Sequence, residues 1–535
     1  MTADSKNADS SSERAAPASH SVLSPRHSVL APWLERATVA CLFLYAAAAP
    51  HSIAGTQTAW LLAMLFWVLR LCFRPRPALF RTPVDPWLFG FFVLTFLTAL
   101  TSYNPEVSVG KLRAASLFTV VYVASQNVRS PRVLRALALT LVASCALGLL
   151  HTFGVYARGR GVKLQALAAD SPLRAVGFVE GDTVFSVDGA EVRSPEEVVR
   201  GIEAERPAPR ERAYRFPDGK VACRWDERAA CVRVYRAEAL PTGNVARDAL
   251  PPGATAEARL GILDWSRGRE ERASGFYGQY QTYAEVLQLV ASVALGMLLS
   301  LRRRLSLKGF LLGVALAGML VALILTVTRA SWAGLLASAF TVALVGASRR
   351  TLLWTAALAL PLALAGLFVL QQKRQVGFID PKEGSTSWRL LVWREGAQIL
   401  VSSPRHLLVG VGMDSLKRRW REWGMFDQGR QPWGHLHSTP LQIAFERGVP
   451  ALLVWAAWLF VYGRMLWRLA RGGLEGDWVV RGLALGALGG LVGFLSAGLV
   501  HYNFGDSEVV MVFYLIMGLA LAAERLTRAA PEAAA

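Results

Sequence analysis

The feature of this sequence that most constrains its fold is a series of apolar runs, each long enough to cross a lipid bilayer. A helix that spans the hydrocarbon core needs about 20 mostly apolar residues. Of the 535 residues, 53% are hydrophobic and 18% are charged, and a soluble protein of this length could not bury so much apolar side chain. The sequence therefore predicts an all-α polytopic membrane protein with about 12 transmembrane helices, at residues 37–54, 56–73, 86–102, 109–126, 133–155, 279–301, 309–328, 331–347, 352–371, 442–463, 478–500 and 508–524.

The Lys and Arg residues predict how these helices are oriented. The chain has 58 Lys and Arg against 39 Asp and Glu, a net charge of +19, and we do not expect a basic chain this apolar to bind nucleic acid. Short cytoplasmic loops carry an excess of Lys and Arg. With twelve helices, the basic loops all fall on one side with both termini: Arg74, Arg76 and Arg81; Arg129, Arg132 and Arg135; Arg302, Arg303, Arg304 and Lys308; Arg349 and Arg350; Arg464, Arg468 and Arg471; Arg525 and Arg528. We expect that side to be the cytoplasm, with two long segments, 156–278 and 372–441, in the periplasm.

This topology divides the chain into membrane and extramembrane parts. We expect a bacterial inner-membrane protein surrounded by membrane lipids, with its parts in this order: a disordered cytoplasmic tail (1–36), helices 1–5 (37–155), a periplasmic insertion (156–270), helices 6–9 (271–371), a second periplasmic loop (372–441), helices 10–12 (442–527) and a cytoplasmic tail (528–535).

The insertion is predicted to be a small α+β domain. Asp170-Ser171-Pro172-Leu173-Arg174 leads to Glu180-Gly181-Asp182-Thr183-Val184, and Ser194-Pro195-Glu196-Glu197 has the residues of a capped helix start. This order resembles a bacterial PDZ domain over about residues 165–202. PDZ domains add an extended peptide to a sheet edge, so the resemblance implies a peptide or protein ligand. The alternative is a domain that only spaces or shields the rest of the chain.

Two of the five cysteines lie in this polar insertion. Cys223 and Cys231 flank a predicted hairpin turn between 220–222 and 232–234. In an oxidising compartment a disulfide between them is plausible, and two free thiols are the alternative. Cys41, Cys72 and Cys145 lie in apolar runs, where small packing residues are expected.

Four polar clusters fall on the predicted periplasmic face. They are Arg272-Ala273-Ser274-Gly275-Phe276-Tyr277-Gly278; Thr326-Val327-Thr328-Arg329-Ala330-Ser331-Trp332; Ser385-Thr386-Ser387-Trp388-Arg389, continuing to Gly410-Val411-Gly412; and His435-Leu436-His437-Ser438, followed by Gln442, Glu446, Arg447 and Gly448. In this order they resemble the motifs of the O-antigen ligase and O-antigen polymerase family of membrane glycosyltransferases. The resemblance covers roughly 37–155 and 271–527. Gln279 and Gln281 stand where the family has Asn, and the large insertion is not typical of it.

The resemblance implies transfer of a glycan from a polyprenyl-pyrophosphate carrier to an acceptor hydroxyl at the periplasmic face. The acceptor is a glycolipid, a glycan or a protein. Arginine binds phosphate through two hydrogen bonds and stays charged when partly desolvated. Arg329 and Arg272 are therefore the predicted partners of the departing pyrophosphate, and Arg389 and Tyr277 are predicted substrate-binding residues. Snorkelling to the interface is the alternative role of Arg329.

The histidines supply the predicted acid–base chemistry. His437 has the family's offset to Gly448 and is the predicted base for the acceptor hydroxyl. His435 is its rival, and His501 and Asp506 end the eleventh predicted helix on the same face, where they would line the site. The alternative for each histidine is a hydrogen-bonded loop residue. With no D-x-D motif and no paired carboxylates at ligand spacing, we expect no metal and no cofactor.

The sequence was also compared with the requirements of other functions. O-antigen or exopolysaccharide polymerisation and protein O-glycosylation use the same chemistry, and the sequence does not separate them from ligation. A lipid-linked glycan transporter shares the fold class but does not need a histidine and arginines on one face. An intramembrane protease with zinc needs H-E-x-x-H, and no His of this chain is followed by Glu.

Overall fold

The structure is a computed structural model. It describes residues 30–205, 213–215, 221–224, 226–236, 242–269, 272–346, 384–431, 434–472 and 477–532. Residues 1–29 of the predicted disordered tail 1–36, the predicted span 352–371 and the basic pair at 349–350 lie outside the described residues. Residues 30–36 of that tail were predicted wrongly, because they form the start of the first helix.

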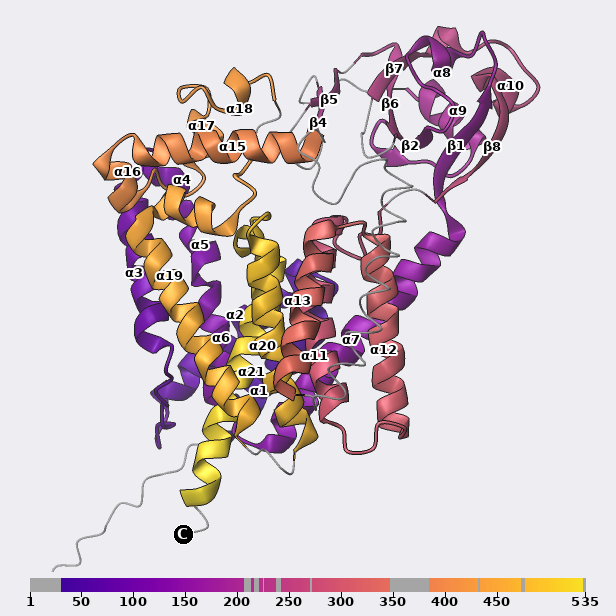
Figure 1. Ribbon diagram of the computed structural model, residues 1–535. Helices are drawn as coiled ribbons and strands as arrows, with labels where there is room; N and C mark the ends of the chain where they lie inside the picture. The colour runs from indigo at the N-terminus through magenta and orange to yellow at the C-terminus, as the bar shows by residue number, and fades with distance from the viewer. Residues whose placement is uncertain are drawn as a thin grey trace, which may run out of the picture.

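A bundle of long helices forms the body of the molecule (Figure 1). Its elements are α1 (Leu30–Ala48), α2 (Ile53–Cys72), α3 (Asp85–Leu100), α7 (Pro131–Arg158), α11 (Tyr280–Ser300), α12 (Leu307–Leu325), α13 (Arg329–Gly346), α19 (Thr439–Arg471), α20 (Trp478–Gly498) and α21 (Ser507–Glu532). Within the described ranges, nine helices are long and apolar enough to cross a membrane, and Asp85–Leu100 is a shorter apolar helix. The chain is thus a multi-pass membrane protein, as predicted.

The predicted helix at 109–126 is broken into pieces. In its place lie α4 (Pro105–Gly110), α5 (Leu112–Ala115), a 3-10 turn η1 (Ser116–Phe118) and α6 (Thr119–Asn127). The first break falls at Lys111, whose Nζ lies 2.7 Å from Asp414. An ammonium group near a membrane helix is stable only beside a partner or a wet cavity, and Lys111 has both, as described below.

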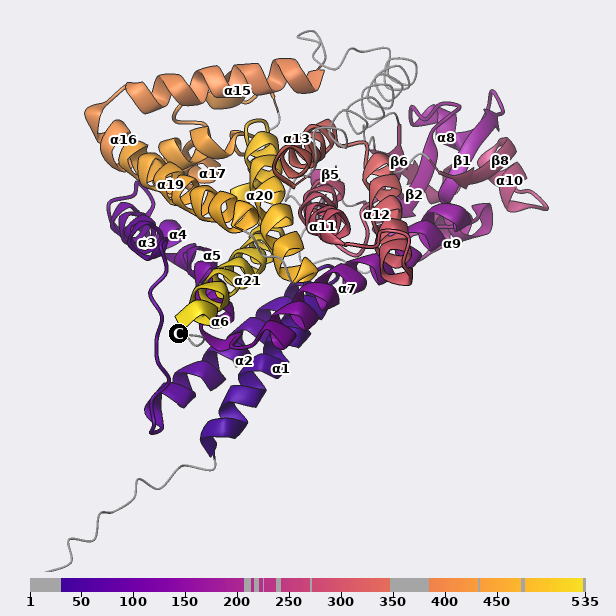
Figure 2. The ribbon, with the colours of Figure 1, turned by 60° about the horizontal axis from the view of Figure 1, so that its bottom comes forward.

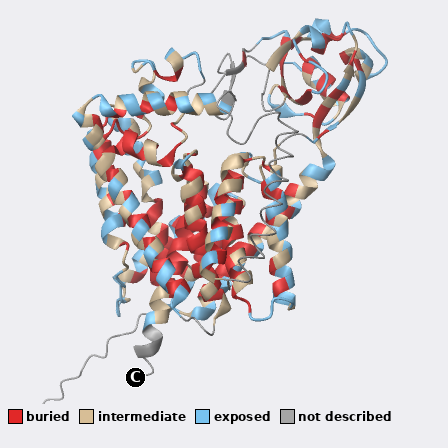
Figure 3. Cartoon of the chain, viewed as in Figure 1, coloured by how far each residue is buried: buried red, intermediate tan, exposed pale blue. Residues whose placement is uncertain are grey.

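The centre of the bundle is packed through small residues. Figure 3 shows the buried residues concentrated in α11, α20 and α21. A Cβ atom added to Gly486 of α20 would lie 2.4 Å from the Cα of Val293 on α11, so only glycine allows the two backbones to come this close. Small residues at such contacts are how membrane helices gain packing energy, because lipid tails are as apolar as leucine. These three helices therefore form a rigid frame.

The two ends of the bundle differ in character (Figure 1). One end carries the insertion and helix α15 (Gly384–Val401), and the other carries the turn between α11 and α12 and the C-terminal end of α21. Predicted cytoplasmic arginines lie at the second end: Arg302 is in the turn between α11 and α12, and Arg525 is in the last part of α21. The chain order of the described helices places the basic loops together, as the charge pattern predicts.

The insertion folds as a separate α+β unit at the end of α7 (Figure 2). Its antiparallel sheet has the order β7-β6-β2-β1-β8, with β3 paired to β2. The strands are β1 (Arg160–Leu167), β2 (Thr183–Val187), β3 (Ala190–Glu191), β6 (Ala229–Tyr235), β7 (Thr242–Ala246) and β8 (Ile262–Gly268). The short helices are α8 (Pro172–Ala175), α9 (Pro195–Glu203), η2 (Arg247–Ala249) and α10 (Ala256–Leu260). Ser194 caps α9, because its hydroxyl accepts from the amide of Glu197, as predicted.

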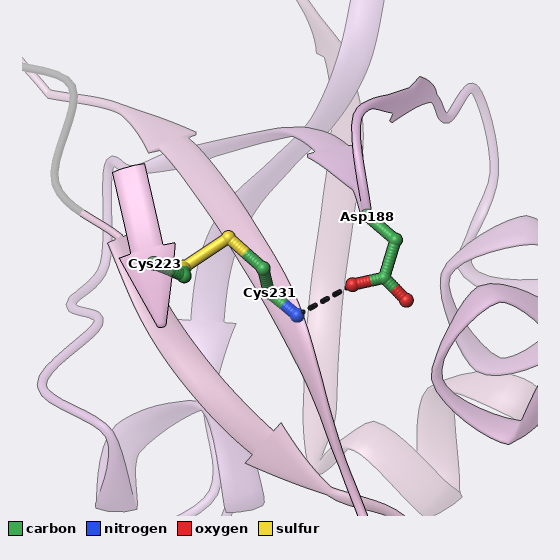
Figure 4. Close-up of a disulfide and its surroundings, with 3 residues drawn as sticks. All are labelled: Asp188, Cys223 and Cys231. Carbon is green, nitrogen blue, oxygen red and sulfur yellow. Dashed lines mark hydrogen bonds between the residues drawn. A yellow bond between two sulfur atoms is a disulfide. The ribbon is translucent and has the colours of Figure 1, made fainter. Parts of the chain in front are cut away.

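Cys223 and Cys231 form a disulfide, with Cα atoms 5.7 Å apart (Figure 4). The hairpin expected around them is wrong. In the described residues β5 (Val221–Arg224) pairs with β4 (Ala213–Arg215), because both edges of β6 are already taken by β2 and β7. The amide of Cys231 donates to the Asp188 carboxylate at 2.8 Å, so the disulfide ties the small two-stranded sheet to a fixed point of the main sheet.

The second long loop is helical where the structure describes it. Helix α15 lies across the end of the bundle (Figures 1 and 2). It is followed by α16 (Pro404–Val409), α17 (Ser415–Arg419) and α18 (Met425–Gln428). Val392 of α15, Phe426 of α18 and Leu436 are fully buried in a small core that joins these segments. This core fixes the segment that carries His435 and His437.

Candidate active site

A cavity of about 400 Å³ opens at this end of the bundle. Its walls come from α3, α5, the first turns of α11, the loop before α17, the first part of α19 and the segment 501–510. Three predicted site residues line it: His435, His501 and Asp506. Residues more than 200 positions apart in the sequence meet there, because α11, α19 and α21 all begin at this end. The cavity is large enough for a small part of a substrate such as one sugar ring.

His437 packs against the cavity histidines. Its ring centroid lies 4.0 Å from that of His435 and 5.8 Å from that of His501, and Trp388 of α15 meets it edge-on at 4.9 Å. His437 has φ of 46°, a left-handed backbone that a side chain other than glycine rarely adopts. Such strain persists where the surroundings fix the backbone. Here the neighbouring Leu436 donates its amide to Gln442 at 2.7 Å.

His501 is held by two bonds to buried residues. Its Nδ1 lies 2.5 Å from Oε1 of Glu285 on α11, and its carbonyl oxygen accepts from the hydroxyl of Thr439 at 3.0 Å. Asp506 is also tied to α11, because the hydroxyl of Thr282 donates to its carboxylate at 2.5 Å. Thr282 and Glu285 are three residues apart and therefore on one face of the helix. The first two turns of α11 thus fix both ends of the 501–506 loop.

A buried carboxylate, Glu446, organises the opposite wall. It accepts hydrogen bonds from Gln442 at 2.9 Å, from Arg447 at 3.1 Å, from the hydroxyl of Tyr502 at 3.3 Å and from the amide of Asp414 at 3.1 Å. Four donors satisfy a charge that would otherwise be costly to bury. Arg447 is 7% exposed and also lines the cavity.

A break in α19 brings this wall into place. Gly448 has φ of 82° and Pro450 has no amide hydrogen, so the carbonyls of Phe445 and Glu446 lose their helical donors. The amides of Val411 and Gly412 replace those donors, each at 2.9 Å. The turn at residues 410–412 therefore docks against the broken helix.

The predicted arginines divide into two places, and none of them lines the cavity in the described residues. Arg329 and Arg389 meet at Ser385: Nη2 of Arg329 donates to its hydroxyl at 3.3 Å and Nη1 of Arg389 to its carbonyl at 3.2 Å. Arg272 instead lies over the ring of Tyr280, 4.4 Å from its centroid. The hydroxyl of predicted Tyr277 donates to the carbonyl of Ala49 at 2.6 Å.

Burial and neighbouring charges shift the pKa values of His435 and Asp414, which both line the cavity. Burial lowers the pKa of His435 to about 3, and the positive charges of Lys417 and Arg389 act in the same direction. Burial raises the pKa of Asp414, but the hydrogen bonds and charges of Lys111 and Lys417 outweigh it and hold that pKa below its usual range. His435 is therefore a neutral imidazole at neutral pH, and it is a poor base there.

Sequence reasoning placed Glu446 and Arg447 in a polar cluster without giving them a role, and it missed several other cavity residues: Lys111, Glu285, Asp414, Lys417 and Tyr502. For two of them a signal exists, because Lys111 and Glu285 interrupt apolar runs, and ionisable residues inside such runs mark functional or paired positions. Among the described residues, no group of three or more His, Cys, Asp or Glu side chains is arranged to hold a metal ion.

The comparisons with known proteins point to one family. No curated protein matches the chain. The family model of the O-antigen ligase matches residues 314–456, a stretch that contains Arg329, Arg389, His435 and His437 but not Arg272, Tyr277, His501 or Asp506. The match supports the predicted relation to an enzyme family of surface-polysaccharide assembly, with a lipid-linked glycan donor and a glycan acceptor. Residues 314–456 of this multi-pass membrane protein are therefore similar to the O-antigen ligase family.

Proposed function

We propose that the chain transfers a glycan from a polyprenyl-pyrophosphate carrier to an acceptor hydroxyl, as an O-antigen ligase does. One observation carries this proposal: a cavity lined by His435, His501 and Asp506, with His437 packed on its edge, adjoins the segment that matches the ligase family. The basic loops support the further proposal that this cavity opens on the periplasmic face of the inner membrane, because short cytoplasmic loops carry an excess of Lys and Arg.

The chemistry needs a base for the incoming hydroxyl and positive charge for the leaving group. The acceptor oxygen attacks the anomeric carbon, the bond to the pyrophosphate breaks, and an imidazole of the cluster takes the hydroxyl proton. The motif designates His437 for this role, and His501 lines the cavity beside it. Such a displacement inverts the anomeric configuration, and it needs no metal when fixed arginines neutralise the pyrophosphate.

The arginines bind the pyrophosphate in this proposal. Arg329 and Arg389 converge on Ser385 at the start of α15, where two guanidinium groups offer several donors to one diphosphate. Arg272 is the third proposed cation, at the start of α11. The cavity itself holds carboxylates at positions 285, 414, 446, 506 and 508, which suit neutral sugar hydroxyls better than a diphosphate. We therefore assign the sugar and the acceptor to the cavity, and the pyrophosphate to Arg329 and Arg389 at Ser385, which we call the arginine rim.

The α+β insertion has a proposed role in recruitment. Its β7 and β8 are the edges of the main sheet, and PDZ-like domains bind an extended peptide along such an edge. A peptide or protein ligand of this domain would act on the same face as the cavity.

A deletion strain tests the proposed function. Its surface glycan is resolved on a gel after complementation with the wild-type chain, His437→Ala or Arg329→Ala. We expect only the wild type to restore the glycan. Arg394→Ala is the matched control, because Arg394 is exposed on the same helix as Arg389. Full restoration by both His437→Ala and Arg329→Ala would refute the mechanism.

The same strain separates ligation from its rivals. Long chains left on the carrier indicate a ligase, and single capped units indicate a polymerase. A transporter predicts donor lipid trapped on the cytoplasmic side, whereas a transferase leaves it accessible to a periplasmic enzyme.

A further inference from the structure

Arg447 is a buried cation in the cavity wall that the proposed reaction does not use. It lines the cavity and is 7% exposed. Arginine stays charged in proteins, so the side chain carries a positive charge that needs partners. Glu446 is one partner, because Nη1 of Arg447 donates to its Oε2 at 3.1 Å. The ring of Phe91 is another neighbour, with its centroid 5.9 Å from Cζ of Arg447.

The guanidinium of Arg447 retains hydrogen-bonding capacity that a ligand can use. A guanidinium group carries five N–H donors. Among the described residues, Nε of Arg447 has no hydrogen-bond partner. Glu446, in contrast, already accepts four hydrogen bonds, including those from Arg447 and Tyr502. Glu446 therefore holds the arginine in place, and Arg447 is the member of the pair that can donate to a group in the cavity.

Arg447 lies at the deep end of the cavity. It is eight residues from the first residue of α19 (439 to 447), and Tyr514 is seven residues from the first residue of α21 (507 to 514). Phe91 is nine residues from the last residue of α3 (91 to 100), and all three side chains line the cavity. At about 1.5 Å per helical residue, they lie roughly 10–13 Å along their helices from the end at which the cavity opens.

The surroundings of Arg447 in the cavity are largely apolar. Four buried side chains line the same cavity, and at most 7% of each is exposed: Phe91, Leu117, Val510 and Tyr514. We call these four residues and Arg447 the cavity floor. The floor thus combines one charged hydrogen-bond donor with apolar contact surface.

A group that fits this floor needs an oxygen acceptor next to an apolar end. A carboxylate or phosphate suits it poorly, because Glu446 already balances the charge of Arg447 and five carboxylates line the cavity. A sugar hydroxyl can accept from the guanidinium, but it leaves the apolar side chains without a contact. An acetamido group offers both features, because its carbonyl oxygen accepts hydrogen bonds and its methyl group is apolar.

We infer that the cavity floor binds the acetamido group of an N-acetylated amino sugar. The guanidinium of Arg447 donates to the carbonyl oxygen, and the methyl group packs against Phe91 and Val510. This inference rests on the proposed function and names the substrate class of the same cavity. Arg447 is then a specificity-determining residue, because a sugar with a hydroxyl in place of the acetamido group loses both contacts.

Ligand-detected NMR with the purified full-length protein in detergent tests the inference. The probes are the methyl glycosides of N-acetylglucosamine, glucose and glucuronic acid, which offer an acetamido, a hydroxyl and a carboxylate group. We expect the wild type to bind the N-acetylglucosamine glycoside about 10-fold or more tightly than either of the others. Saturation transfer from the protein should be strongest at the acetamido methyl group.

Two variants test the floor itself. Arg447→Lys keeps a positive charge beside Glu446 but loses the planar guanidinium, so we expect it to lose the preference, a change of about 10-fold. Arg405→Lys is its matched control, because Arg405 packs over the ring of Tyr103 instead, at 4.1 Å from its centroid. Val510→Phe fills the space of the methyl group and should also lose the preference. Val314→Phe, at a 55% exposed position of α12, should keep it.

Three results would overturn the inference. Equal binding of the N-acetylglucosamine and glucose glycosides by the wild type removes the acetamido site. Tightest binding of the glucuronic acid glycoside makes the floor an anion site. A preference that survives in Arg447→Lys, or in Val510→Phe if the lysine variant does not fold, leaves Arg447 a structural partner of Glu446. These measurements need no turnover, whereas failure of the proposed function would show as a wild-type protein that releases no polyprenyl pyrophosphate from its native donor.

Discussion

Single residues around the cavity are polar groups that a membrane protein tolerates only with partners. Glu285 has His501, and Glu446 has Arg447, Tyr502 and Gln442. Removing one member of such a pair leaves the other buried and unsatisfied, which costs more than the pair contributes. Substitutions here therefore affect stability as well as transfer, and the control variants above are chosen for that reason.

We expect the stability of the folded state to fall at acidic pH because of His435. Its pKa is about 3 in the folded chain, whereas an unfolded histidine titrates near about 6.5. Between these values the unfolded state binds a proton that the folded state does not, so stability falls as the pH drops from about 6.5 towards 3. His435→Gln should flatten the fall of the melting temperature in detergent between about pH 7 and 5. An unchanged pH dependence would contradict this.

Gly448 should resist substitution. Its φ of 82° costs another residue about 1–3 kcal/mol, and an added Cβ would lie 2.3 Å from the carbonyl oxygen of Leu408. Gly448→Ala should therefore melt at a lower temperature and transfer less glycan. Gly313→Ala is the comparison, because an added Cβ there meets nothing within 4 Å. Equal melting temperatures of the two variants would show that the break in α19 does not need glycine.

At the scale of elements, the disulfide should stabilise the insertion rather than the bundle. Cys223 and Cys231 close a loop of sequence separation 8, which corresponds to about 2–3 kcal/mol in the chain-entropy treatment. We expect Cys223→Ser, or added reductant, to speed proteolytic cleavage within residues 160–268 of the full chain. Cys72→Ser, which removes an exposed free thiol, should have no effect. Equal cleavage rates with and without reductant would contradict the expectation.

Element by element, length and apolarity were enough to predict most of the long apolar helices that the described residues contain, because the membrane excludes other regular structures. The interruption at Lys111 was not predicted, since it depends on Asp414, some 300 positions away. The expected hairpin failed for a similar reason: only the sheet order reveals that β6 has no free edge. His435, His501 and Asp506 were predicted because topology alone brings their loops to one face. Glu285 was not, because its partner is known only from the packing of α11.

At the scale of the whole molecule, the topology is open to a direct test. A periplasmic reporter enzyme fused after Gly201, in the insertion, should be active. The same reporter fused after Leu305, in the turn between α11 and α12 at the opposite end, should be inactive. Activity of the second fusion alone would reverse the orientation and place the cavity in the cytoplasm.

The central claim is that this cavity and its arginine rim transfer a glycan from a lipid carrier. The most direct measurement is the rate at which the purified protein, reconstituted with donor lipid and acceptor from the deletion strain, releases polyprenyl pyrophosphate and forms the transferred product. We expect release by the wild type and by His51→Ala, which lies outside the cavity and bonds to Ser144. We expect a loss of about 10²-fold or more in His437→Ala and in Arg329→Ala. Wild-type rates in both variants, or no release by the wild type, would contradict the claim.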